Sequence, residues 1–310
     1  MRRTLWALAL LAVLAVACGG QTEPAAAPFP SPSPVASPEA SPPTAALTGA
    51  PLTDPAALTR PVLAVKVDNA LAARPPLGRE LADIVIEELV EGGFTRFIAL
   101  YHSTNPGTVG PVRSGREVDA LLLPPFAPVV AVAGAAPPTR EAMQAAGLRV
   151  LDETSGGGAL HRVRDRRGPH NLVAEAPGLW AAGAGLPPAS PPWPFDPAVP
   201  AGGGPAAAAQ RVFPPKAAAA WTWDPAGGAW LRDEDGAPHV AASGQRLAAH
   251  NVVVARVPVS AGGGQDVRGT PTVNIQVLGE GDALVLRDGQ ALTARWRKVA
   301  PTAHFEWLTP

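Results

Sequence analysis

Apolar residues recur along this chain in two patterns that predict different elements. Short apolar runs bounded by proline, glycine or aspartate predict strands, and a longer pattern with apolar residues three or four apart predicts a helix. The first short run, residues 62–67, follows Pro61 and precedes Asp68-Asn69. This arrangement is typical of a buried strand that ends in a turn.

A second pair of runs predicts a hairpin. Residues 84–91 and 94–101 flank Gly92-Gly93, which suits a two-residue turn, and a helix over residues 84–90 is the alternative. Cross-strand neighbours share a face in such a hairpin. One face would carry Ile84, Ile86, Val90, Phe97 and Tyr101 as the core, and the other would carry Glu87, Glu91 and Arg96.

The next segment predicts helices between strands. Residues 114–117, Ser-Gly-Arg-Glu, match a capping box, which predicts a short helix through Leu123. Strand-like runs at residues 129–133 and 148–151 flank a helical pattern at residues 139–146 that ends at a glycine. The order of these elements predicts a β-α-β unit. The fold class expected for this domain is therefore mixed α/β (α+β).

The last hundred residues predict a β-rich domain built from hairpins. The expected strands are residues 221–223, 229–232, 252–257, 273–278, 283–286 and 291–297, with turns at residues 224–228 and at Asp288-Gly289. Trp221, Trp223 and Trp230 alternate on the first hairpin. Core packing is favoured for them over stacking on a carbohydrate.

The N-terminal residues 1–18 have the features of a bacterial lipoprotein signal peptide. Two arginines precede an apolar run at residues 5–17, which is shorter than the roughly 20 residues that span a bilayer. Residues 14–18, Leu-Ala-Val-Ala-Cys, resemble a lipobox, and Cys18 is the only cysteine. We therefore expect a lipid anchor on Cys18 that holds the protein at the extracytoplasmic face of the cell membrane. An ordinary cleaved signal is the alternative.

Composition divides the rest of the chain. Residues 19–50 are rich in proline, alanine and serine, which predicts a disordered tether rather than a folded segment, with a proline-rich recognition motif as the alternative. A second segment rich in proline, glycine and alanine, residues 179–209, predicts a linker. The mixed domain would then cover residues 51–178 and the β-rich domain residues 210–310.

Charge and motifs exclude several classes of function. The formal net charge is −1, whereas nucleic-acid binding requires a strong basic excess. The sequence has no phosphate loop, nucleophile elbow, zinc-protease motif or dinucleotide fingerprint. His161 and His170 lack a carboxylate or cysteine at ligand spacing, so no metal site is expected, and no cofactor is implied.

Strings spread over the chain carry a resemblance to a known family. They are residues 65–69, 82–85, 87–97, 110–116, 169–172, 251–254 and 279–283. Together they resemble the YerB-type family of bacterial lipoproteins, whose two domains have unknown function. The resemblance implies a further strand with glycine and tryptophan beyond Pro310, so the C-terminal domain is expected to be shortened.

Arginines near the predicted short helix are the first candidate site. Arg113 and Arg116 flank Ser114 where unpaired backbone N–H groups of a helix N-terminus would favour an anion. The structural alternative is that both arginines pair with Glu87, Glu88 or Glu91. Asp68-Asn69 follows the first strand, where α/β sheets bind ligands, or else it forms a local turn.

The densest basic stretch, residues 161–171, is the second candidate. It is either a solvated loop or a lid that supplies arginines to phosphate groups, with His170 as an acid or base and Asn171 beside it. Glu91 and Arg96 complete the candidate binding residues as diagonal neighbours in the hairpin. A carboxylate pair with an acid-base role is a weaker interpretation, because such residues often simply meet arginines.

Two functions of different classes follow. The first is an envelope protein that binds an anionic cell-wall polymer or a protein partner. The second is an envelope enzyme that acts on a phosphorylated glycan or lipid-linked substrate through Asp68, Arg113, Arg116 and His170. Binding is favoured because no complete set of nucleophile, base and orienting group can be named.

Overall fold

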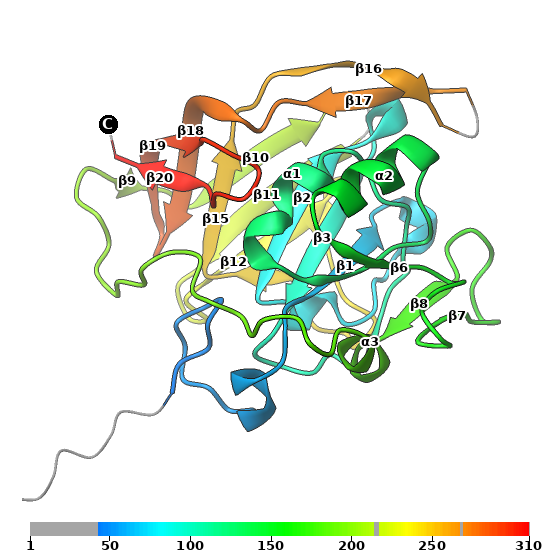
Figure 1. The fold of residues 1–310 in the computed structure, drawn as a ribbon. Coiled ribbons are helices and arrows are strands. Elements are labelled where there is room, and N and C mark those ends of the chain that lie inside the picture. The colour runs from blue at the N-terminus through cyan, green and yellow to red at the C-terminus, as the bar shows by residue number, and fades with distance from the viewer. Residues whose placement is uncertain (1–42, 214–216, 267–268, 310) are drawn as a thin grey trace, which may run out of the picture. The chain divides into compact units, whose positions relative to one another are not determined.

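The computed structural model describes residues 43–213, 217–266 and 269–309, and in this part the chain is mostly sheet with few helices (Figure 1). Residues Pro42–Pro310 form one unit. The predicted signal peptide, Cys18 and most of the predicted tether lie outside the described residues. Residues 43–50, which were assigned to the tether, instead pack on the fold, because Ala45 and Leu47 are buried.

A five-stranded sheet in the order β2-β3-β1-β5-β6 forms the centre of the N-terminal part. Its strands are β1 (Leu63–Asp68), β2 (Ile84–Leu89), β3 (Thr95–Tyr101), β5 (Val129–Ala131) and β6 (Arg149–Leu151). β1 pairs antiparallel with β3 and parallel with β5, and β5 pairs parallel with β6. The strands predicted at residues 62–67, 129–133 and 148–151 are therefore present.

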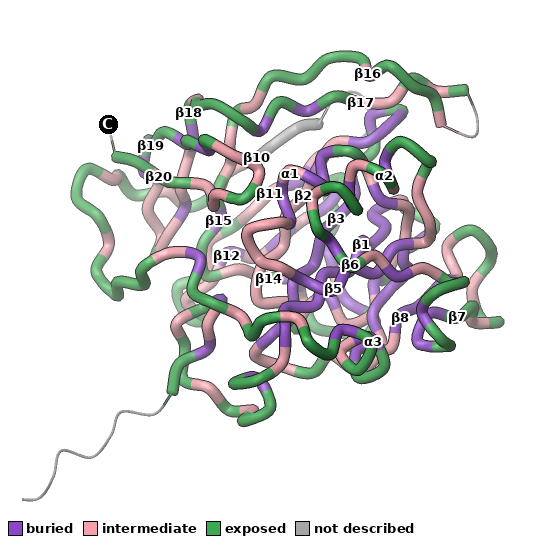
Figure 2. Tube along the Cα trace, in the orientation of Figure 1, coloured by how far each residue is buried: buried purple, intermediate pink, exposed green. Residues whose placement is uncertain are grey.

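Both faces of this sheet are covered, which explains why every residue of β1 is buried (Figure 2). The short helix α1 (Asp119–Leu122) and α2 (Pro137–Ala145) supply Leu122 and Met143 to the core on one face. On the other face, α3 (Ala176–Ala182) supplies Leu179. A three-stranded sheet of β4 (Thr108–Val109), β8 (Leu172–Glu175) and β7 (Leu160–Arg162) adds to that second face.

The predicted two-residue hairpin turn is wrong, and the pairing of the two strands differs from the prediction by one residue. The last pair of β2 and β3 is Leu89 with Thr95, and a longer connection with a 3-10 turn at Glu91–Gly93 joins them. Gly92 and Gly93 both have positive φ, 70° and 76°, which this connection requires. A slip of one residue moves side chains to the opposite face. Ile84 and Ile86 accordingly share one core with Ile98 and Leu100, whereas Phe97 and Tyr101 belong to the other core.

The predicted capping box is also wrong. The helix begins at Asp119 rather than after Ser114, has four residues, and has no side-chain hydrogen bond from its N-cap residue. Asp119 supplies the cap-like contact instead, because its Oδ2 accepts from the backbone N–H of Arg116 at 2.8 Å. So short a helix has almost no dipole, and the argument for an anion at its N-terminus therefore fails.

The C-terminal part consists of strands, as its hairpin pattern predicts. One sheet contains β10 (Ala208–Phe213), β11 (Ala217–Asp224), β12 (Ala229–Glu234), β13 (Ala237–Pro238) and β14 (Ala248–Ala249). A second contains β9 (Gly204–Pro205), β15 (Asn251–Ala255), β18 (Gly279–Arg287), β19 (Gln290–Lys298) and β20 (Glu306–Leu308), and β16 (Val259–Gln265) pairs with β17 (Pro271–Ile275). Trp230 is fully buried against Trp223, as expected for core packing.

Candidate functional site

Charged side chains gather at one end of the central sheet because of its register. Asp68 of β1 lies opposite Arg96 of β3, and Arg96 lies opposite Glu88 of β2. Lys66 lies two residues before Asp68 in β1. Since side chains alternate along a strand, these four residues share one face. All four are buried, so each of them requires partners within the protein.

Lys66 is held between two carboxylates. Its ammonium group forms ion pairs with Glu88 and with Oδ1 of Asp119, the latter at 2.6 Å. Burial raises the pKa of Glu88 to about 7, with a further increase from Asp119, although Lys66 acts in the opposite direction. This buried group is a scaffold, because no more than 3% of any of its three side chains is exposed.

Three arginines lie beside this scaffold. Arg96 donates through Nη1 to the carbonyl of Ser114 at 2.8 Å, and Arg116 pairs through Nε with Oε2 of Glu91 at 3.0 Å. Burial lowers the pKa of Arg96 to about 10, and the nearby charges of Arg116 and Arg113 lower it further. Arg116 also donates through Nη1 to the carbonyl of Ser114, at 3.3 Å, so two of the guanidinium groups meet at one carbonyl.

Asp68 connects these arginines to the basic stretch at residues 161–171. Its Oδ2 lies 2.7 Å from Nδ1 of His170 and 3.1 Å from Nε of Arg113, while its Oδ1 accepts from the N–H of Ala70 at 3.0 Å. Arg113 Nε does not meet hydrogen-bond geometry, so its contact with Asp68 is an ion pair only. In the described part of the chain, Nε2 of His170 has no hydrogen-bond partner.

The structure brings together some of the candidate residues and separates others. Asp68, Arg96, Arg113, Arg116 and His170 meet, with Glu91 as the partner of Arg116 and Ser114 contributing only its carbonyl. Asn69 instead donates to Thr95 Oγ1 at 2.7 Å, and Asn171 accepts from Arg162 at 2.9 Å. The structural alternative, pairing with a glutamate, is present for Arg116, whereas Arg113 pairs with Asp68 rather than with a glutamate.

A second buried charged group was not predicted from the sequence. Arg232 of β12 donates to Glu87 of β2 at 2.8 Å and 3.0 Å, pairs with Glu234, and contacts Nδ1 of His239 at 2.7 Å. Burial, followed by nearby arginines, lowers the pKa of His239 to about 2, so its neutral ring can accept this bond. The available signal was weak: β12 has three apolar residues followed by Arg232, Asp233 and Glu234, so a run of charge lies within a strand.

This second group includes a further guanidinium. Arg79 is buried and its Cζ lies 3.8 Å from the ring centre of Phe97. Burial, and next the charge of Arg232, lower the pKa of Arg79 to about 9. The group thus joins residues before 100 to residues after 230 and belongs to the scaffold that connects the two parts of the fold.

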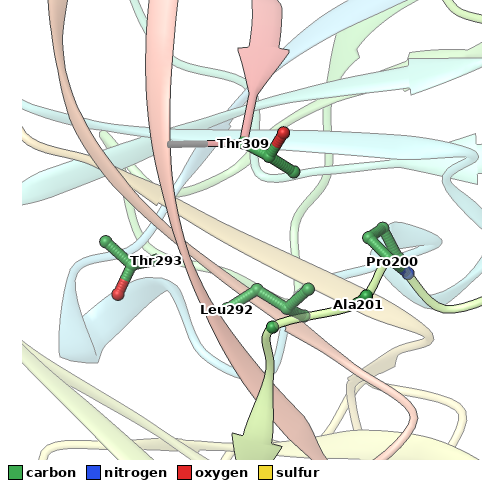
Figure 3. Close-up of a pocket in the computed structure, with 6 residues that line it drawn as sticks. Pro200, Ala201, Leu292, Thr293 and Thr309 are labelled. Carbon is green, nitrogen blue, oxygen red and sulfur yellow. The ribbon is translucent and has the colours of Figure 1, made fainter.

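The described residues show little sign of another ligand site. A surface cavity of about 460 Å³ is lined by uncharged residues before β9, on β19 and after β20, among them Ala201, Leu292 and Thr309 (Figure 3). None of its lining residues is ionisable. Within the described ranges there is also no cluster of His, Cys, Asp and Glu that could hold a metal, and no helix suited to cross a membrane.

Comparison with known families decides the classification. Residues 47–187 match the N-terminal domain, and residues 210–310 the C-terminal domain, of a family described as "Protein of unknown function (DUF3048)". The chain belongs to the DUF3048 family. Its two matched domains correspond to the mixed and the strand-rich parts of the fold.

Relatives in Bacillus subtilis agree with this classification. The chain is 38% identical over 128 residues to "Putative lipoprotein YerB" of strain 168, a match that covers 41% of this chain and 38% of that protein. The crystal structure of the YerB protein from B. subtilis is similar in fold, with a TM-score of 0.73 at 24% identity, covering 86% of this chain and 93% of that chain.

Proposed function

We propose that this protein is a lipid-anchored envelope protein that binds an anionic group, of a cell-wall polymer or a protein partner, at Arg96, Arg113, Arg116 and His170. The exposed fractions of these side chains support the proposal. About a fifth of each of the Arg113, Arg116 and His170 side chains is exposed, whereas only 5% of Asp68 and of Glu91 is exposed. Hydrogen-bond donors are therefore accessible and the carboxylates that orient them lie beneath.

Electrostatics agree with this assignment. The formal charges balance, because three guanidinium groups and Lys66 meet four carboxylates, but the carboxylate side chains are at most 5% exposed and the accessible groups are cationic. Arginine binds phosphate or carboxylate groups through two parallel hydrogen bonds, and Arg113 can orient an oxyanion in this way. Arg116 adds mainly its charge, because its nitrogens already donate to Glu91 and to the carbonyls of Ser114 and Gly115. The Nε2 of His170 adds a donor when its ring is charged or carries the proton there.

Replacing Arg113 by alanine is expected to weaken binding of inorganic pyrophosphate more than tenfold, which corresponds to about 1.4 kcal/mol. The thermal stability should change little, because Asp68 keeps His170 and the N–H of Ala70 as partners. Titration calorimetry at low ionic strength measures the binding, since salt screens exposed charges.

The matched control is Arg140→Ala, which removes another arginine paired with an aspartate, at 2.6 Å, in the same domain. This variant should bind pyrophosphate like the parent. If the parent has no affinity for the anion, or if Arg113→Ala melts far below Arg140→Ala, Arg113 is a structural residue and the proposed function is wrong.

The anchor has its own test. The lipobox-like residues 14–18 and the name of the B. subtilis relative support lipidation at Cys18. Replacement of Cys18 by alanine is expected to abolish incorporation of labelled fatty acid and to leave the precursor uncleaved by the lipoprotein peptidase. A variant that still incorporates lipid and fractionates with membranes would show that the anchor lies elsewhere.

The contact of Asp68 with His170 favours one alternative. A carboxylate at Nδ1 with Nε2 left open is how an acid-base histidine is oriented, so the same residues could act on a phosphate ester. Steady release of phosphate from a model ester, lost in His170→Ala while pyrophosphate binding persists, would favour an enzyme over a binding protein.

A further inference from the structure

Residues 163–170, called the arginine loop below, join β7 to β8 beside the candidate site. The loop contains Arg164, Arg166 and Arg167 with a single acidic residue, Asp165. These three arginines lie close to His170 in the chain. They take no part in the proposed binding of a single anion. The arginine loop therefore requires a separate explanation.

The body of the protein holds this loop in place. Arg166 donates through Nη1 to the carbonyl of Ala73 at 2.9 Å and through Nη2 to the carbonyl of Pro75 at 2.7 Å. At the end of the loop, His170 contacts Asp68 at 2.7 Å. Contacts at both places fix the loop relative to the candidate site, so the loop backbone keeps a defined position beside that site.

Arg164 and Arg167 are the side chains that the loop presents to solvent. Both residues are exposed, and neither guanidinium group has a hydrogen-bond or ion-pair partner within the described part of the chain. The N–H of His170 donates to the carbonyl of Arg167 at 2.9 Å, which places Arg167 within one turn of the site. Arg162, just before the loop, is occupied by Glu153 at 2.8 Å and is therefore not available.

We propose that the arginine loop extends the candidate site into a track for a linear polyanion with repeated phosphate groups. This inference rests on the proposed function and specifies its ligand. One phosphate would contact Arg113 and His170, and the following phosphates would contact Arg167 and Arg164. A single small anion at His170 would leave both loop arginines unpaired, whereas a chain places its next charges close to them at a high effective concentration.

Chain-length dependence tests the inference. The full-length protein, reconstituted in phosphatidylcholine vesicles, should bind long-chain inorganic polyphosphate at least tenfold more tightly than pyrophosphate. Arg164→Ala/Arg167→Ala should lower the affinity for polyphosphate at least fivefold and change that for pyrophosphate less than twofold. Arg256→Ala/Arg295→Ala, which also removes two exposed arginines but from the C-terminal domain, should leave both affinities unchanged.

The outcomes separate this inference from the proposed function. If pyrophosphate does not bind the parent, the proposed function fails. If pyrophosphate binds but polyphosphate binds no more tightly, or the loop variant behaves like the parent, only the polyanion track is overturned. Adding phosphatidylglycerol to the vesicles provides the last arm. If it lowers polyphosphate binding in the parent but not in the loop variant, the loop arginines contact lipid headgroups and the track is overturned as well.

Discussion

Replacing Lys66 by methionine is expected to destabilise the fold by about 3–5 kcal/mol, the usual cost of breaking a buried ion pair from one side. The change leaves Glu88 and Asp119 without their shared cation, at side-chain exposures of 3% and 1%. Methionine has nearly the length of lysine, so the loss would come from charge rather than from a cavity. Denaturant unfolding at neutral pH measures it.

Lys298 provides the matched control. It is also buried, but its ammonium group contacts the carbonyls of Pro301 and Ala303, and burial lowers its pKa to about 8. Lys298→Met leaves neutral carbonyls and should cost less, about 1–3 kcal/mol. An equal loss of unfolding free energy in the two variants would mean that the carboxylates at Lys66 add no cost beyond that of neutral partners.

The deficit of Lys66→Met should also depend on pH. The pKa of Glu88 is already raised to about 7 from 4.5, and loss of Lys66 raises it further. A carboxyl whose pKa is raised on folding stabilises the fold below its unfolded pKa, and that stability is lost as pH rises through the folded pKa. The variant should therefore be closer to the parent at pH 5 than at pH 8.

Local patterns predicted the strands well but not their register. The apolar runs at residues 62–67 and 129–133 correspond to β1 and β5, because a buried strand needs apolar residues whatever its neighbours are. The register of β2 and β3 was misjudged by one residue. Both faces of this sheet are buried, so alternation of apolar residues could not distinguish the two registers.

The sequence pointed to site residues only where a charged or polar residue stands out from its neighbours in the chain. Arg113, Asp68 and His170 were candidates from their types and positions, and the fold brings them together across 102 residues of sequence. Lys66 drew no attention, although a lysine inside an apolar strand already indicates a buried partner. Arg232 and Glu87 could not have been paired, since 145 residues separate them and only tertiary packing brings them together.

Replacing Arg232 by methionine is expected to destabilise the protein by a similar amount, about 3–5 kcal/mol. Burial alone would lower the pKa of Arg232, but Glu87 and Glu234 outweigh it and raise that pKa, so the guanidinium remains charged. Its removal takes the closest cation from the nearly inaccessible Glu234, which keeps an ion pair with Arg74 at 3.5 Å. Thermal and denaturant unfolding should both show the loss.

Arg246→Met is the control for this variant. Arg246 pairs at 2.6 Å with Asp233, which lies in β12 next to Arg232, and both side chains of this pair are more than a quarter exposed. An ion pair of that exposure contributes at most about 1 kcal/mol.

A double-mutant cycle of Arg232→Met with Glu87→Gln isolates the contact between the two family domains. We expect a coupling of about 1–3 kcal/mol, in the range measured for contacting residues. The coupling has a structural consequence, because Glu87 lies in the N-terminal domain and Arg232 in the C-terminal domain. The Arg232→Met variant should therefore unfold less cooperatively than the parent, and a single sharp transition with no coupling would show that this pair does not join the domains.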